Sequence, residues 1–407
     1  MGNPNQAGLP QTQQTSGGLP LGALMALPSA GMLQTLSDGS KWLRTGVIVA
    51  KSVAPTAALV ETLRAHQFSE SASSALPSVA ASFLVTNGSG TYVVGYGSGD
   101  ATNVYVSTDY GVTWTARAHN MAGATGPFGM CWTGSYFVGV NTAGTTFYAC
   151  TSPDGVTWTA SATGVTSGGT YTANTAKVVW TGTTVFACTA ATGANQCMTS
   201  PTGLTGTWTT RVLAVSISSA PQLDASSYGI IMQFGTSVQT GTADGITWTS
   251  RSPGTIVSAA KPMAFSDRFV LFQAVGGVTT QSVDSGLTWS NPVNSGVDAP
   301  TYAQMGKTAA GRVYGVSATN PQISYTDDGV YWKTQGFAIT NPASQYPSVA
   351  NSFIATDGAR SMVLVTAGAT GQKVQYAASS FNASNAIGTA VSYSTGSSGT
   401  NLFAKVK

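Results

Sequence analysis

Carboxylate side chains, which most hydrolytic and acid–base chemistry needs, are scarce in this chain and stand mainly where turns are expected. The 407 residues include 14 Asp and Glu together. The two glutamates, Glu61 and Glu70, both precede residue 75, and none follows. Most aspartates occupy Asp-Gly or Asp-x-Gly turns, which leaves Asp100, Asp224 and Asp298 uncommitted. Because glycosidases usually use paired carboxylates, we predict that no residue is catalytic.

The basic and imidazole side chains do not form a catalytic or metal-binding pattern either. Arg117, Arg211 and Arg251 each lie three residues after a tryptophan of a repeat, so they occupy one structural position in three repeats. The two histidines, His66 and His119, are far apart and lack ligand spacing. Two of the four cysteines flank a hairpin loop and could pair, but no disulfide framework is apparent and we expect buried free thiols. We predict no metal site and no cofactor.

A short motif ending in tryptophan recurs six times between residues 107 and 332. Its fullest form, Ser107–Trp114, reads Ser-Thr-Asp-Tyr-Gly-Val-Thr-Trp. Successive tryptophans are 44, 50, 40, 41 and 43 residues apart, and a period near forty indicates a repeat architecture. The residues that define the copies are Ser107, Asp109, Gly111 and Trp114; Ser152, Asp154, Gly155 and Trp158; Trp208; Asp244, Gly245 and Trp248; Ser282, Asp284, Gly286 and Trp289; and Asp328, Gly329 and Trp332.

Each copy joins two β-rich runs through Asp-Gly or Asp-x-Gly, which predicts a β-hairpin. The glycine supplies a positive φ, and the Asp and Ser/Thr oxygens can accept hydrogen bonds from turn amides. The flat tryptophan suits a wedge between neighbouring sheets. Two more strand-like runs precede the hairpin, such as 82–86 and 91–96 in the first unit. Four short strands per forty-odd residues predict one blade of a β-propeller.

The number of blades depends on the segment that follows the last motif. Residues 352–356 and 361–365 resemble the first two strands of a blade, 373–376 supply a third strand and 391–393 could supply the fourth. The Asp-Gly-Trp signature is absent there, but terminal repeats are often atypical. We therefore predict an all-β fold: a seven-bladed propeller of four-stranded antiparallel blades, with six blades as the alternative.

The motif resembles the Asp box, also called the bacterial neuraminidase repeat. The third copy departs most, because Thr202 stands where aspartate is expected. The resemblance implies a propeller, but it does not imply one function, since such propellers include sialidases, sorting receptors, assembly factors and viral adhesins. It also implies that the boxes lie on the face away from the ligand site. The Asp-box residues are therefore expected to shape turns.

The residues before the propeller differ in composition. Residues 1–40 are rich in Gly, Pro, Gln and Ser, and about 56–66 has the pattern of a short helix after Pro55. Residues 37–46, Ser-Asp-Gly-Ser-Lys-Trp-Leu-Arg-Thr-Gly, are similar to attachment segments of bacteriophage tail and fibre proteins. The predicted domains are an extended N-terminal virion-attachment segment with that one helix (1–74), the propeller (75–396) and a C-terminal strand or tail (397–407).

Charge is sparse, at 8% of residues with a net charge of +3. No basic cluster indicates nucleic-acid binding, and no apolar run is long enough to span a membrane, so we expect neither nucleic acid nor membrane insertion. With the phage resemblance, the chain is expected to be a virion protein, assembled in the host cytoplasm and released by lysis. Its partners would be other tail proteins, bound through the N-terminal segment, and a homo-oligomer is a further option.

A ligand is expected on the propeller face opposite the boxes, where the loops are longer and more varied. The candidate ligand-binding residues there are Tyr96, Asp100, Asn103, His119, Asn120, Phe128, Asn141, Asn195 and Gln196. The leading function is binding of a host-surface receptor, such as a polysaccharide, without catalysis. The alternatives are a purely structural virion component that uses the propeller as a spacer or decoration, and a glycan-cleaving, sialidase-like enzyme.

Overall fold

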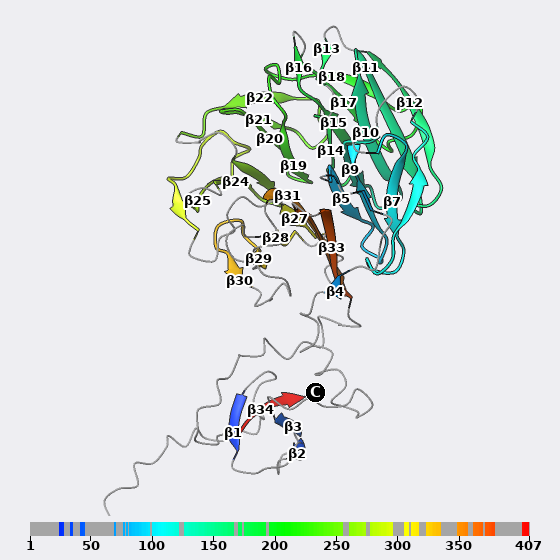
Figure 1. The fold of residues 1–407 in the computed structure, drawn as a ribbon. Helices are drawn as coiled ribbons and strands as arrows, with labels where there is room; N and C mark the ends of the chain where they lie inside the picture. Colours follow the sequence, from blue (N-terminus) through cyan, green and yellow to red (C-terminus); the bar gives the residue numbers. More distant parts are fainter. Residues whose placement is uncertain are drawn as a thin grey trace, which may run out of the picture. The chain divides into compact units, whose positions relative to one another are not determined.

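The computed structural model describes most of the chain between residues 76 and 378, together with five short strands outside that range (Figure 1). The described residues are 24–27, 33–35, 41–44, 69–70 and 401–406, and all of 76–378 except 78, 80, 98–99, 122–125, 167–169, 173–174, 193–194, 255–259, 274–276, 296–304, 309–310, 317–322, 335–347, 357–360 and 369–370. The predicted helix at 56–66 lies outside them.

The chain forms two compact units, one of Met1–His66 with Ser379–Lys407 and one of Gln67–Ala378. These limits differ from the predicted boundaries at 74/75 and 396/397. The first unit holds an antiparallel sheet whose strand order is β1 (Leu24–Leu27), β34 (Asn401–Val406), β3 (Lys41–Arg44) and β2 (Leu33–Thr35). The C-terminal strand β34 therefore pairs with two strands from the start of the chain, Leu24–Leu27 and Lys41–Arg44.

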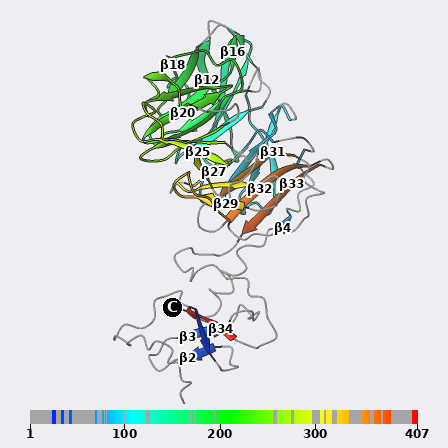
Figure 2. The ribbon, with the colours of Figure 1, turned by 90° about the vertical axis from the view of Figure 1, so that its left-hand side faces the viewer.

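The second unit is a β-propeller of four-stranded antiparallel blades (Figures 1 and 2). Six blades follow one another along the chain, with only the two-stranded pair β13 (Thr170–Tyr171) and β16 (Ala191–Thr192) inserted at the third. In order, their strands are β5 (Phe83–Thr86), β6 (Tyr92–Gly95), β7 (Asn103–Ser107), β8 (Thr115–Ala118); β9 (Gly129–Trp132), β10 (Phe137–Ala143), β11 (Thr146–Ser152), β12 (Thr159–Thr166); β14 (Lys177–Trp180), β15 (Val185–Cys188), β17 (Gln196–Ser200), β18 (Thr209–Val212); β19 (Gln222–Ser226), β20 (Gly229–Phe234), β21 (Ser237–Gly241), β22 (Trp248–Arg251); β23 (Lys261–Ala264), β24 (Phe269–Gln273), β25 (Val278–Ser282), β26 (Val293–Asn294); and β27 (Met305–Lys307), β28 (Val313–Val316), β29 (Ile323–Thr326), β30 (Lys333–Thr334).

A composite sheet follows the sixth blade. Its order is β31 (Ser348–Thr356), β32 (Ser361–Gly368), β33 (Gly371–Ala378) and β4 (Ser69–Glu70), so its outer strand comes from before the first blade. Strand β31 lies beside both β27 and β5. The prediction of a seventh blade like the others, completed by residues 391–393, is therefore wrong. Each of six blades is built from the strands of one repeat, which is the alternative count, whereas the outer strand of the last sheet is β4.

Burial follows the order of strands within a blade. The second strand is buried throughout, as in β6 and β20, whereas the fourth is largely exposed, as in β8 and β18. The first strands of neighbouring blades lie side by side, as β5 does with β9 and β14 with β19. The first strands therefore line the axis of the propeller, and only their side chains can meet there across blades.

Each repeat tryptophan packs against the blade before its own. The rings of Trp248 and Phe186 are 4.8 Å apart between centroids, and those of Trp332 and Phe272 are 5.2 Å apart. Trp158 joins a buried cluster that includes Val93 of the first blade. As the sequence predicted, tryptophan fills the space between neighbouring sheets and stabilises the ring by burying apolar area.

Candidate functional site

The repeat hairpins use their carboxylates within the turn. In the first copy, Ser107 Oγ donates to Asp109 at 2.7 Å and accepts from the Gly111 amide at 2.8 Å. Thr113 donates to Asp109 through its amide and its hydroxyl, and the Trp114 indole donates to Gly111 O at 3.1 Å. Burial opposes the shift, yet these hydrogen bonds hold the pKa of Asp109 below its usual range. A carboxylate held this way remains an acceptor and is unsuited to acid catalysis.

The later copies repeat this geometry. A Ser or Thr hydroxyl donates to the aspartate in each of four hairpins, and in each the tryptophan or the turn amides complete the loop. These aspartates are Asp154, Asp244, Asp284 and Asp328. In the third copy, where Thr202 replaces aspartate, the hydroxyls of Ser200 and Thr207 pair instead, and Trp208 still donates to Gly203 O.

The candidate ligand residues on the opposite face are mostly engaged with their own loops. Asp100 accepts hydrogen bonds from the Thr102 and Asn103 amides and, at 2.7 Å, from the Tyr105 hydroxyl. Burial acts to raise its pKa, but these bonds outweigh it and lower the pKa of Asp100 to about 2. Tyr96, 2% exposed, packs edge-on against Tyr105.

Three further candidates are held by backbone groups. His119, 2% exposed, contacts Ala101 O through Nε2 and accepts from the Met121 amide through Nδ1, and burial lowers its pKa. The side-chain amide of Asn120 donates to Trp158 O at 2.8 Å, and that of fully buried Asn141 donates to Gly126 O. These side chains position loops.

The remaining candidates are Asn195, Gln196 and Phe128. Asn195 donates to Leu213 O at 2.9 Å, Gln196 is half-buried at the start of β17, and the Phe128 ring lies 5.7 Å from Lys177 Nζ. None of the nine predicted ligand residues lines either of the two cavities described next. The sequence analysis selected mainly polar residues of variable loops, and most of these side chains form hydrogen bonds that hold the loops in place.

The larger cavity is a cleft of about 630 Å³ on the face that carries the first and third turns of the blades. This face includes the repeat hairpins, so the cleft is not on the opposite face, where the sequence analysis expects a ligand. Its wall is formed by the ends of the first strands and the turns after them, in the third to sixth blades. The lining residues are Trp180, Thr181, Gly182, Ala225, Ser226, Ser227, Ala264, Phe265, Ser266, Asp267, Arg268, Lys307, Thr308, Gly311, Asp327 and Asp328. A cleft of this volume can hold one or two sugar rings.

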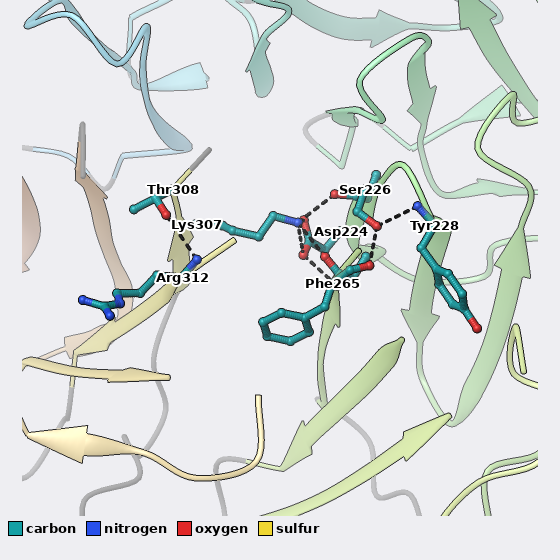
Figure 3. A network of polar contacts seen from close by, with 9 residues as sticks. Asp224, Ser226, Tyr228, Phe265, Lys307, Thr308 and Arg312 are labelled. Carbon is teal, nitrogen blue, oxygen red and sulfur yellow. Dashed lines mark hydrogen bonds and ion pairs between the residues drawn. The ribbon is translucent and has the colours of Figure 1, made fainter. Parts of the chain in front are cut away.

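Lys307 ties three first strands together at the base of this cleft (Figure 3). Its ammonium donates to both oxygens of Asp224 at 2.8 and 2.7 Å, to Ala225 O at 2.7 Å and to Ala264 O at 3.0 Å. Asp224 also accepts from the Ala264 amide at 2.9 Å. Both charged side chains are 23% exposed. The pair therefore joins β19, β23 and β27 and is occupied by these bonds.

Two further carboxylates that line the cleft, Asp267 and Asp327, are also in ion pairs. Arg268 and Asp267 are 2.7 Å apart, and Arg312 at the rim lies 2.6 Å from Asp327. The hydrogen bond from Arg268 holds the pKa of Asp267 below its usual range. The sequence analysis missed Lys307, Arg268 and Arg312, which share a position at the end of a first strand or in the turn after it. It assigned Asp267 and Asp327 to turns and left Asp224 uncommitted.

The described residues contain no helix that could span a membrane. Within the same residues, no group of three or more His, Cys, Asp or Glu side chains is placed to hold a metal ion. All four cysteines are buried free thiols, and burial raises the pKa of each.

Solved structures with the same fold define the class of this protein as a β-propeller. A streptogramin B lyase structure matches with a TM-score of 0.50 at 11% identity, covering 76% of this chain and 96% of that one. A chain of the mitotic checkpoint complex matches with a TM-score of 0.50 at 11% identity, covering 76% and 90%. YCF48 bound to a D1 peptide gives 0.49 at 12% identity, covering 76% and 94%. At these identities the likeness concerns the fold alone.

No protein-family profile matches the sequence, and none of the curated proteins resembles it in sequence. The particular activity of this propeller must therefore be argued from its own residues.

Proposed function

We propose that the propeller is a binding module that recognises a carbohydrate in the large cleft without cleaving it. The observation that carries the proposal is the make-up of the cleft: the aromatic side chains Trp180 and Phe265 beside hydroxyls such as Ser266 and ion-paired carboxylates. Sugars present apolar ring faces and many hydroxyls. A concave site with an aromatic surface and a few fixed polar groups is complementary to both.

The state of the carboxylates supports binding rather than hydrolysis. A glycosidase needs a general acid whose pKa is raised. In the cleft, the bond from Arg268 lowers the pKa of Asp267, and turn amides outweigh burial to lower that of Asp328. Asp224 is held by Lys307 and a backbone amide. Asp267 and Asp328, whose pKa values are lowered, accept hydrogen bonds from sugar hydroxyls well and donate none.

The proposal places this binding module in a bacteriophage virion, where the N-terminal segment attaches to tail proteins and the propeller recognises a polysaccharide of the host surface. Two features support this setting: the resemblance of residues 37–46 to tail-fibre attachment segments, and the division of the chain into two compact units. The second candidate is a structural virion component in which the propeller is a spacer.

The test compares two variants of matched chemistry. Ser266 is exposed in a turn that lines the cleft, and Ser135 is exposed in the equivalent turn of the second blade, outside the cleft. Ser266→Arg fills the cleft with a long side chain, whereas Ser135→Arg adds the same side chain elsewhere. Full-length protein is mixed with host cells and with cells stripped of surface polysaccharide, and both bound protein and released sugar are measured.

We expect saturable binding that is lost on stripping, lost in Ser266→Arg and retained in Ser135→Arg, with no sugar released. Equal binding by the two variants would remove the cleft from the proposal. An absence of binding to every host tested would favour the structural role. Released sugar would overturn the proposal that the propeller binds a carbohydrate without cleaving it.

A further inference from the structure

The first strands of the propeller carry more positive than negative charge. In sequence, β5, β9, β14, β19, β23, β27 and β31 together contain three lysines, Lys177, Lys261 and Lys307, and one carboxylate, Asp224. Asp224 is already bound to Lys307. Among the described residues, no carboxylate is within ion-pair distance of Lys177 or Lys261, so the axis retains two lysines without a counter-ion.

These two lysines lie at the end of the axis away from the cleft. The last residues of the first strands, such as Trp180 and Lys307, line the cleft. Lys177 and Lys261 are instead the first residues of β14 and β23, and Gln222 is the first residue of β19, which lies between those strands. The three side chains therefore come from one end of three adjacent first strands.

Polar contacts connect this end of the axis. Lys261 Nζ donates to Gln222 Oε1 at 3.4 Å, and Lys177 Nζ lies 5.7 Å from the centroid of the Phe128 ring. A second cavity, of about 170 Å³, is lined by Gln222 and Lys261 together with Met305, Asp224 and Lys307, while Lys177 is outside its lining. Its volume suits a single charged group rather than a sugar ring.

Burial disfavours the charged form of both lysines, and the charge of Lys177 adds to this at Lys261. Burial, and then the charge of Lys177, lowers the pKa of Lys261 to about 8. Burial lowers the pKa of Lys177 as well, opposed by the neighbouring Cys188. Two partly desolvated cations at one end of a channel raise the energy of the empty protein, and an anion placed between them would lower it.

We propose that Lys177 and Lys261, with Gln222, form a binding site for an oxyanion group, a carboxylate or a sulfate, at the end of the axis opposite the cleft. The site is separate from the proposed carbohydrate cleft and does not depend on it. Its ligand can be a free anion or the acidic substituent of a larger glycan; the chemistry at the lysines is the same, since each ammonium donates a charge-assisted hydrogen bond to an anionic oxygen.

The experiment titrates the full-length protein with sodium sulfate, sodium glucuronate and an acidic polysaccharide, each against sodium chloride of equal ionic strength, and follows the melting temperature. The variants are Lys177→Gln, Lys261→Gln and, as a control, Lys333→Gln. Lys333 is exposed on β30, the outer strand of its blade, and two strands separate β30 from the first strand β27.

We expect the melting temperature to rise saturably with sulfate or glucuronate, and to rise more than it does with chloride. The apparent affinity should fall about tenfold or more in Lys177→Gln and Lys261→Gln and stay unchanged in Lys333→Gln. A response to the polysaccharide but not to the free anions would identify a glycan substituent as the ligand. Equal shifts with chloride and sulfate, or undiminished binding by both axis variants, would overturn the site.

A second measurement needs no ligand. If the two ammonium groups repel each other, each Lys→Gln variant at the axis should melt at or above the temperature of the unmodified protein in low salt. This measurement of stability without ligand also tests the proposal if anion binding is too weak to follow. A clear loss of stability in both axis variants would show that the lysines are structural contacts and would exclude the proposed anion site.

Discussion

Lys307→Met should destabilise the propeller far more than an ordinary lysine substitution. The variant keeps the length and the apolar stem of the side chain but leaves Asp224 without its cation. At 2.7 Å, two unit charges attract by about 6 kcal/mol at an effective dielectric constant of ~20. Desolvation of the pair offsets roughly half of this, and both side chains keep partial access to water, so we expect a loss of about 2–3 kcal/mol.

In a unit of this size, Gln67–Ala378, that loss corresponds to a fall in melting temperature of roughly 3–5 °C. Asp224→Asn should cost less, because Lys307 would still donate to Ala225 O and Ala264 O. Thermal unfolding of the two variants, of their combination and of the exposed control Lys333→Met tests the argument. The combination should cost less than the sum of the single losses. A fall for Lys307→Met no larger than that for Lys333→Met would refute the view that this pair ties the first strands together.

Three further outcomes follow from the fold. Hydrogen bonds, the largest contribution coming from the Thr288 hydroxyl, lower the pKa of Asp284 to about 2 in the folded protein. The stabilisation from this carboxylate is therefore complete above about pH 4 and is lost as the pH falls toward 2. The difference in melting temperature between Asp284→Asn and the unmodified protein should close over that pH range. Gly245→Ala, whose Cβ would lie 2.6 Å from a side chain of the preceding blade, should cost about 1–3 kcal/mol more in denaturant unfolding than Gly254→Ala, which has a similar φ but open space. Replacing both Ser69 and Glu70 by proline should remove β4 from the composite sheet and accelerate limited proteolysis there, and unchanged proteolysis would contradict the pairing.

The propeller could be predicted from the sequence because its repeat encodes both the turn and the packing. The Asp-Gly turn fixes one hairpin of each blade, and the tryptophan after it fills the space against the preceding blade. The glycine has a second role that the turn alone does not reveal: Gly203 and Gly245 approach side chains of the preceding blade so closely that a Cβ would clash. A local motif thus specifies a contact between repeats.

The composite sheet could not be predicted in the same way. Its outer strand, Ser69–Glu70, has only two residues and no alternating pattern, and it precedes the first blade by a dozen residues. Strand pairing between distant segments depends on which sheet edge is left open, and the sequence has no Asp-Gly-Trp motif after β33. The absence of that motif was visible in the sequence, but the strand that would replace it was not.

The candidate site was only partly accessible to sequence reasoning. Polar residues in long loops were taken as ligand contacts, yet His119 and Asn141 serve the loops themselves. Lys307 and Arg268 were not predicted as site residues, because a single charged residue in a short strand or turn has the pattern of a solvated surface residue. Their importance comes from convergence of first strands around an axis, which is a property of the ring and not of any one repeat.

That convergence gives the sparse charge of the chain its meaning. A lysine at the start of a first strand faces one end of the axis, and one at its end faces the cleft. Lys307, at the end of β27, meets Asp224 and is neutralised. Lys177 and Lys261, at the starts of β14 and β23, have no carboxylate partner among the described residues, and the charge of Lys177 adds to burial in lowering the pKa of Lys261. The same type of side chain is therefore structural at one end and available to an anion at the other. The two proposed sites can be altered separately, because the residues that line the two cavities have Lys307 alone in common.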